Sequence, residues 1–219
     1  ARRQRQMCIR DSVMNMIIGI GKGPLSYFVW KYLREFVGET LLPYPLFYDA
    51  KRELLNRKLA YVDYLRKLQL KRNEVKIAVY PDYLLPHKAR VDLSSLKSIE
   101  FIVPIHSLED LRIVEELQKM GFNVYYGYAS DPRYRSYSLN DFLRVVKGRK
   151  WYLGVSTRHE LREALNHGFE GMDITSYIFG KNNDRKDPRK LQKMIAEFLN
   201  MINKPQGKRS SILEFLSVN

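Results

Sequence analysis

The feature that most constrains the fold of this chain is a regular alternation of short β-rich runs with longer segments of helical periodicity. Successive β-rich runs end near residues 82, 107, 131 and 157. The interval of roughly 25 residues is the length that one β-strand and its crossover helix occupy. This repeat predicts parallel strands joined by helices.

The pattern predicts seven strands and six helices. The strands are expected at 15–20, 46–49, 75–82, 100–107, 124–131, 150–157 and 171–176, and the helices at 25–37, 53–70, 108–120, 139–146, 158–167 and 189–202. Helix starts are marked by possible capping boxes at Ser107, Ser138 and Thr157, and two helix ends by Gly121 and Gly168.

These elements favour an α/β fold of the TIM-like (β/α) barrel type. Such a barrel has eight strands, so the eighth either lies beyond the N-terminal end, which would leave the barrel incomplete there, or escapes the pattern. An open doubly wound sheet gives a similar rhythm. However, no G-x-G-x-x-G follows a strand, and the nearest glycines, at 19–23, have the wrong spacing for dinucleotide binding.

The barrel domain is expected to span residues 13–203. Residues 1–12 resemble a translated adapter sequence and are expected to be a non-native leader, and residues 204–219 a flexible tail. A single cysteine, Cys8, excludes a disulfide and a thiolate zinc site within the chain and favours a reducing, cytoplasmic setting. No apolar run is long enough to span a bilayer, so no membrane partner is expected.

The formal net charge of +14 predicts a polyanionic partner, most simply nucleic acid. A basic surface of the kind found in thermophilic proteins is the alternative. The candidate phosphate contacts follow two of the later strands, and each cluster would otherwise be a solvated face. They are Arg133, Arg135, Lys181, Arg185, Lys186 and Arg189.

Polar side chains end nearly every predicted strand. Ser107, Thr157 and Asp131 are expected to cap the helices that follow. Asp49, Asp82, His106 and Asp173 have no such simple role, and a charge at the end of an apolar strand needs a partner or a ligand. In a barrel, these four side chains would gather at the C-terminal ends of the strands, where loops carry chemistry.

Several of these segments resemble the tRNA-guanine transglycosylases and the related enzymes that place 7-deazaguanine in DNA. Residues 169–177 resemble the segment around the family's nucleophilic aspartate, and residues 101–112 resemble its V-P-V-Q-G-S strand. Residues 46–49 fall where the family has its T-D-S-G-x-F-Q strand. Residues 80–82 fall where it has a base-recognising aspartate. Order and spacing agree over about residues 40 to 185.

The resemblance implies exchange of guanine for a free 7-deazaguanine base in DNA or tRNA. Asp173 would be the nucleophile and Asp49 the second catalytic carboxyl group. Asp82, His106, Ser107 and Tyr177 would contact the base, which would leave its stack. The reaction needs no cofactor and no metal ion.

The sequence also departs from that family. Residues 49–54 lack the family's glycine turn, His106 replaces a glutamine, and the cysteines of the structural zinc site are absent. A nucleic-acid-binding protein without catalysis is therefore a second hypothesis. A third is a metal-dependent hydrolase with Asp49, Asp82, His106 and Asp173 as ligands, although no H-x-H or H-E-x-x-H spacing is present.

The tail carries a separate pattern. Residues 209–216 resemble the sliding-clamp docking peptide Q-x-x-[ILM]-x-x-[FY]-[FL], with Ile212, Phe215 and Leu216 at the apolar positions and Arg209 in place of the glutamine. One helical turn would place the three apolar side chains on one side. A sliding clamp as partner would favour DNA over tRNA as the substrate.

Overall fold

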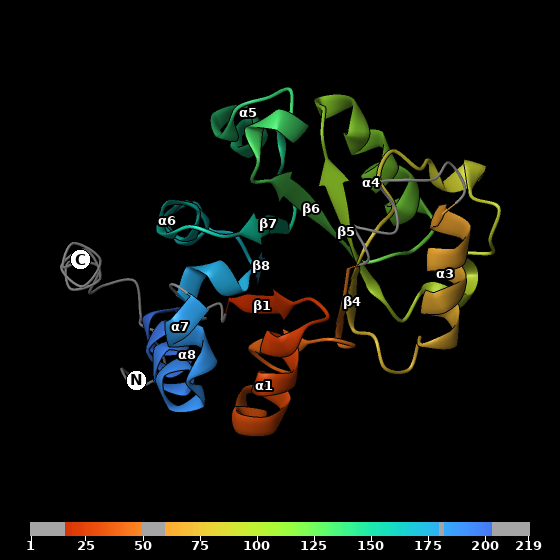
Figure 1. Cartoon of the computed structure of the whole chain (residues 1–219). Helices are drawn as coiled ribbons and strands as arrows, with labels where there is room; N and C mark the ends of the chain where they lie inside the picture. Colours follow the sequence, from red (N-terminus) through yellow and green to blue (C-terminus); the bar gives the residue numbers. More distant parts are fainter. Residues whose placement is uncertain (1–15, 50–59, 180–181, 203–219) are drawn as a thin grey trace, which may run out of the picture.

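The computed structural model describes residues 16–49, 60–179 and 182–202, and within them eight parallel strands form one sheet in the order β2-β1-β8-β7-β6-β5-β4-β3. Strands that follow one another in the chain are neighbours in the sheet, except β2 and β3, which lie at its two edges. Helices return the chain between most of the neighbouring strands (Figure 1). This arrangement is a TIM-like (β/α) barrel. The strands are β1 (Ile17–Ile20), β2 (Leu41–Pro43), β3 (Phe47–Tyr48), β4 (Ile77–Val79), β5 (Glu100–Ile105), β6 (Val124–Ala129), β7 (Lys150–Val155) and β8 (Gly171–Ile174).

The helices agree closely with the pattern in the sequence. They are α1 (Pro24–Tyr32), α3 (Ala60–Leu70), α4 (Leu111–Lys119), α5 (Leu139–Val145), α6 (Arg158–Asn166), α7 (Asn182–Lys186) and α8 (Pro188–Ile202). The capping boxes at Ser138 and Thr157 form as predicted, with hydrogen bonds in both directions, and Gly121 and Gly168 adopt positive φ after α4 and α6. The short helix α7 was not predicted.

One chain segment brings the two edges of the sheet together. β2 pairs with β1 and β3 pairs with β4, yet only residues 44–46 separate β2 from β3. Pro45, which follows a cis peptide bond, has no N–H for a strand ladder, so the segment breaks into two strands there. The barrel is therefore nearly closed. The eighth strand is β2. It is only three residues long and ends in Pro43, so the sequence pattern did not reveal it.

Aromatic rings fill the inside of the barrel. The ring of Trp151 on β7 stacks on that of Phe47 on β3 at 5.8 Å between centroids, and meets the ring of Tyr125 on β6 edge to face at 5.4 Å. Glycines on two neighbouring strands make room for them. A Cβ at Gly171 would lie 2.2 Å from the Trp151 ring, and one at Gly19 would lie 2.6 Å from that of Phe47. These contacts show that the described part of the barrel interior is packed with side chains around Trp151.

A second apolar layer lies between the sheet and the helices. On α4, Ile113, Val114 and Leu117 are buried against the sheet. The predicted stripe on α8 is buried as well, through Leu191, Ile195, Phe198, Leu199 and Ile202. No helix within the described ranges is both long enough and apolar enough to cross a membrane. Residues 1–12, Lys181 and the tail with Ile212, Phe215 and Leu216 lie outside the described residues, so the predictions for them stay predictions.

Candidate functional site

A cavity of about 470 Å³ opens at the C-terminal ends of the strands and is called the mouth cavity below. Asp49 after β3, Asp82 after β4, His106 after β5 and Asp173 on β8 all line it. Four polar residues that are far apart in the sequence therefore share one space. The other lining residues are Val79, Tyr80, Pro104, Ala129, Ser130, Asp131, Pro132, Tyr134, Leu153, Gly154, Ser156, Glu160 and Thr175.

Asp173 is held by two hydrogen bonds, one to each carboxylate oxygen. The indole Nε1 of Trp151 donates to Oδ1 at 3.0 Å, and the backbone N–H of Gly154 donates to Oδ2 at 3.0 Å. The pairing of β7 with β8 shifts register between Tyr152 and Val155, and Gly154 has φ +75°. This bulge takes the Gly154 N–H out of the regular ladder and turns it toward Asp173. The two donors fix the orientation of the carboxylate.

His106 and Asp82 form an ion pair on the adjacent wall. Nε2 of His106 lies 2.9 Å from Oδ1 of Asp82, and Nδ1 lies 2.7 Å from the carbonyl oxygen of Tyr134. A carbonyl and a carboxylate both accept hydrogen bonds, so the ring needs a proton on each nitrogen to satisfy both. Burial lowers the pKa of His106, but the two hydrogen bonds and the charges of Asp82 and Asp110 outweigh it and raise the pKa above its ordinary value. The two hydrogen bonds and the raised pKa both favour the imidazolium form of His106 beside Asp82.

Tyr83 covers this pair from outside. Its ring stacks on that of His106 at 4.7 Å between centroids, with 29° between the planes. Tyr83 has φ +58°, a left-handed conformation that costs a non-glycine residue about 1 kcal/mol or more. Partial burial and the charges of Asp82 and Asp110 raise the pKa of its hydroxyl. A strained, stacked tyrosine beside a cavity marks this wall as a candidate functional surface.

Backbone donors at the strand ends are largely taken by the protein's own carboxylates. Glu160 Oε2 accepts from the N–H groups of Ser156 and Thr157 at 2.7 and 2.8 Å, and Asp173 accepts from that of Gly154. At the end of β5, the N–H groups of residues 106 and 107 both donate to Asp110. In many barrels such donors after the last strands bind phosphate. Here the mouth cavity offers mainly acceptors.

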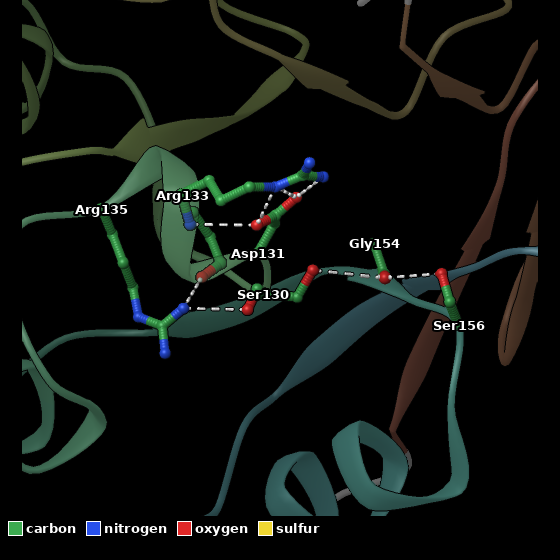
Figure 2. Close-up of polar contacts among 7 residues, drawn as sticks. Ser130, Asp131, Arg133, Arg135, Gly154 and Ser156 are labelled. Atoms are coloured by element: carbon green, nitrogen blue, oxygen red, sulfur yellow. Dashed lines mark hydrogen bonds and ion pairs between the residues drawn. The ribbon is translucent and has the colours of Figure 1, made fainter.

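The two arginines after β6 differ in their surroundings (Figure 2). Arg133 is exposed and folds back on Asp131, with 2.6 Å between its Nη2 and Oδ2. Nη1 of Arg135 instead donates to the carbonyl oxygens of Ala129 and Ser130, at 3.2 and 2.9 Å. Its guanidinium also lies 4.8 Å from the centroid of the buried Tyr128 ring. Arg135 therefore braces the end of β6, while Arg133 faces solvent.

The other predicted contact residues lie outside the set that lines the mouth cavity. The N–H of Ser107 donates to Asp110 within a capping box, as expected for a helix start. Asp131, which does line the cavity, likewise acts as the predicted cap and accepts from the N–H of Arg133. Tyr177 is 71% exposed, and the Arg185 guanidinium lies 5.1 Å from its ring centroid. Lys186 and Arg189 are exposed.

No three His, Cys, Asp or Glu side chains within the described ranges come close enough together to hold a metal ion. The metal-dependent hydrolase hypothesis, which needed Asp49, Asp82, His106 and Asp173 as a ligand set, therefore lacks that set in this part of the chain.

The sequence pattern did not single out Trp151, Gly154 or Glu160. Trp151 reads as an ordinary core residue of a strand, and only the bulge in β7 brings Gly154 under Asp173. Glu160 was predicted as part of a capping box but not as a wall of the cavity. The one usable signal was the glycine at 154 inside an apolar strand, because such a glycine is typical of a bulge.

The fold and the mouth cavity place this protein in the class of TIM-like (β/α) barrels with a carboxylate-lined site at the C-terminal ends of the strands. A protein described as uncharacterized protein ORF192, from Acidianus two-tailed virus, is 35% identical over 199 residues, which cover 91% of this chain and 100% of that protein. The chain belongs to the same family as this viral protein.

No protein-family model matches the chain. Among solved structures, a thiamine phosphate pyrophosphorylase from Pyrococcus furiosus is similar with a TM-score of 0.43 and 18% sequence identity, over 84% of this chain and 96% of that one.

Proposed function

We propose that the mouth cavity takes a guanine-like base and that the protein exchanges this base for a free 7-deazaguanine in DNA or tRNA. The observation that carries the proposal is the convergence of Asp49, Asp82, His106 and Asp173 on one cavity. Its volume of about 470 Å³ falls within the range of small-molecule sites, which leaves room for a base and its sugar.

Asp173 is the nucleophile in this proposal. Its two hydrogen bonds, from Trp151 and Gly154, hold the carboxylate in place at the wall of the cavity. One carboxylate oxygen bonds to C1′ of the sugar while the bond from C1′ to the base breaks, as in retaining glycoside chemistry. A nitrogen of the incoming base then attacks C1′, displaces Asp173 and loses its proton. Asp49 gives the first base its proton and receives that of the second.

Recognition of the base rests on acceptors. The Asp82 carboxylate, oriented by the His106 imidazolium, suits the adjacent N–H groups on the Watson–Crick edge of a guanine-like base. Because Asp173 and Glu160 already occupy strand-end N–H groups, a phosphate would find few donors in the cavity. The phosphates of the polymer would therefore lie outside it, near the exposed Arg133, Lys186 and Arg189 and the half-buried Arg185.

The test is release of labelled guanine from DNA and from tRNA in the presence of a free 7-deazaguanine base. We expect release by the wild type and a fall of at least about a thousandfold in Asp173→Asn, because the nucleophile is lost. Asp141→Asn is the matched control. Asp141 also accepts hydrogen bonds through its carboxylate, but in the capping box of α5 and away from the cavity. The proposal would be refuted if the wild type released guanine from neither DNA nor tRNA. Undiminished release by Asp173→Asn would refute it as well.

Binding of nucleic acid without catalysis is the second candidate function, favoured by the net charge of +14. It predicts salt-dependent binding that Asp173→Asn leaves intact, together with no release of guanine by the wild type. Docking of the tail on a sliding clamp would be compatible with both functions if the substrate is DNA.

A further inference from the structure

Three exposed tyrosines stand at the ends of alternate strands around the mouth cavity. Tyr83 follows β4, Tyr134 follows β6 and Tyr177 follows β8, and their exposed fractions are 66%, 48% and 71%. By contrast, tyrosines within the strands, such as Tyr128 and Tyr152, are 1% exposed. The exposed rings are thus not part of the core, and the parallel strands carry all three to the same end of the barrel.

Each of these rings also has a basic side chain next to it. Tyr83 stacks on the His106 ring, the Arg133 guanidinium lies 5.9 Å from the Tyr134 centroid, and that of Arg185 lies 5.1 Å from the Tyr177 centroid. A cation beside an aromatic ring limits its motion and adds positive charge next to the stacking face. Rings and cations in this combination are what proteins use to hold unpaired bases and their backbone.

We propose that Tyr83, Tyr134 and Tyr177, called the tyrosine rim below, bind single-stranded nucleic acid by stacking its unpaired bases. The proposal rests on the proposed function in one respect: the strand held on the rim is the one that places its base in the mouth cavity. The binding itself needs no catalysis. Because Asp131 neutralises much of the charge of Arg133, stacking rather than ion pairing contributes most of the affinity.

The spacing of the rim selects a single strand over a duplex. Alternate strands of a sheet are about 10 Å apart. Stacked nucleotides in a duplex rise only about 3.4 Å each. Rings on alternate strands therefore cannot contact successive stacked bases, but they can contact bases of a strand that is splayed open. The chain's net charge of +14 attracts the backbone, while the carboxylates of the cavity keep phosphates on the rim.

The experiment measures the dissociation constants of fluorescent oligonucleotides by anisotropy at fixed salt, for single-stranded DNA, single-stranded RNA and duplex DNA of one sequence. We expect the single strands to bind more tightly than the duplex. Tyr83→Ala, Tyr134→Ala and Tyr177→Ala should each weaken single-strand binding about fivefold or more, and the Tyr→Phe variants by no more than about twofold. The preferred strand, DNA or RNA, identifies the polymer.

Tyr32→Ala is the matched control. Tyr32 is 39% exposed and lies under the Lys31 ammonium at 5.1 Å, but it ends α1 and so lies at the opposite end of the barrel. Its replacement should leave binding unchanged. The proposed role of the tyrosine rim would be contradicted if duplex and single strand bound equally tightly. It would also be contradicted if the rim variants bound as tightly as Tyr32→Ala.

The two proposals fail separately. Rim-dependent binding without release of guanine would support the rim and end the base-exchange proposal. Release of guanine with binding that no rim variant weakens would do the reverse.

Discussion

Trp151 donates its indole N–H to Oδ1 of Asp173 at 3.0 Å, so the largest side chain inside the barrel is also the support of the candidate nucleophile. The ring of Trp151 is fixed in turn by Phe47 and Tyr125. Packing of the barrel interior therefore sets the position of a carboxylate at its mouth.

Trp151→Phe should keep the stacking on Phe47 and remove the hydrogen bond to Asp173. A hydrogen bond to a charged group contributes about 1.5–3 kcal/mol, so we expect a loss of roughly 2–4 kcal/mol in the free energy of unfolding once the smaller ring is included. Urea denaturation measures this. In Trp30→Phe, a half-buried indole loses its bond to a neutral carbonyl, that of Tyr44, and the cost should be only about 1 kcal/mol. Equal losses in the two variants would contradict the supporting role of Trp151.

Gly171→Ala tests whether the barrel interior is filled. The added Cβ would lie 2.2 Å from the Trp151 ring, which stacked neighbours prevent from moving. We expect a loss of about 3 kcal/mol or more, or failure to fold. Gly21→Ala is the control, because nothing lies within 4 Å of a Cβ there. Thermal unfolding should show a lower midpoint for Gly171→Ala than for Gly21→Ala. Equal midpoints would show that the barrel interior can accommodate the added methyl group.

The barrel could be predicted from the sequence because short β-rich runs alternate regularly with segments in which apolar residues recur at helical spacing. The convergence of Asp49, Asp82, His106 and Asp173 followed from that topology, since the C-terminal ends of parallel strands meet at one end of a barrel. The roles proposed for these four residues rest on the resemblance.

Two parts of the structure could not be predicted in the same way. The strand β2 is three residues long and carries no period, so it was missed. The bond from Trp151 to Asp173 depends on which face of β7 points inward and on the bulge at Gly154. The facing of β7 is not visible in residue types alone, because a one-residue change of register reverses every side chain of a strand. The glycine at 154 indicates a bulge but not which carboxylate its N–H would reach.

The charge of His106 should make stability depend on pH. The folded-state pKa of His106 lies above the ordinary value of about 6.5, so its contribution is fully present below pH 6.5 and is lost as pH rises through the folded pKa. We expect the unfolding midpoint of the wild type to fall over that interval. His106→Gln should flatten this dependence. A titration of the His106 ring by NMR that gave a pKa at or below 6.5 would contradict the ion pair with Asp82.

Arg133 and Arg135 should respond differently to removal, although both were predicted as phosphate contacts. Arg133→Ala breaks an exposed ion pair with Asp131, and such pairs contribute little, so the free energy of unfolding should change by less than about 1 kcal/mol. Arg135→Ala removes two bonds to the carbonyls that end β6 and the contact with the Tyr128 ring, and should cost about 2 kcal/mol or more. Urea denaturation of both variants under one condition makes the comparison. If Arg135→Ala is no less stable than Arg133→Ala, the guanidinium of Arg135 does not brace the strand end, and both arginines return to the set of candidate phosphate contacts.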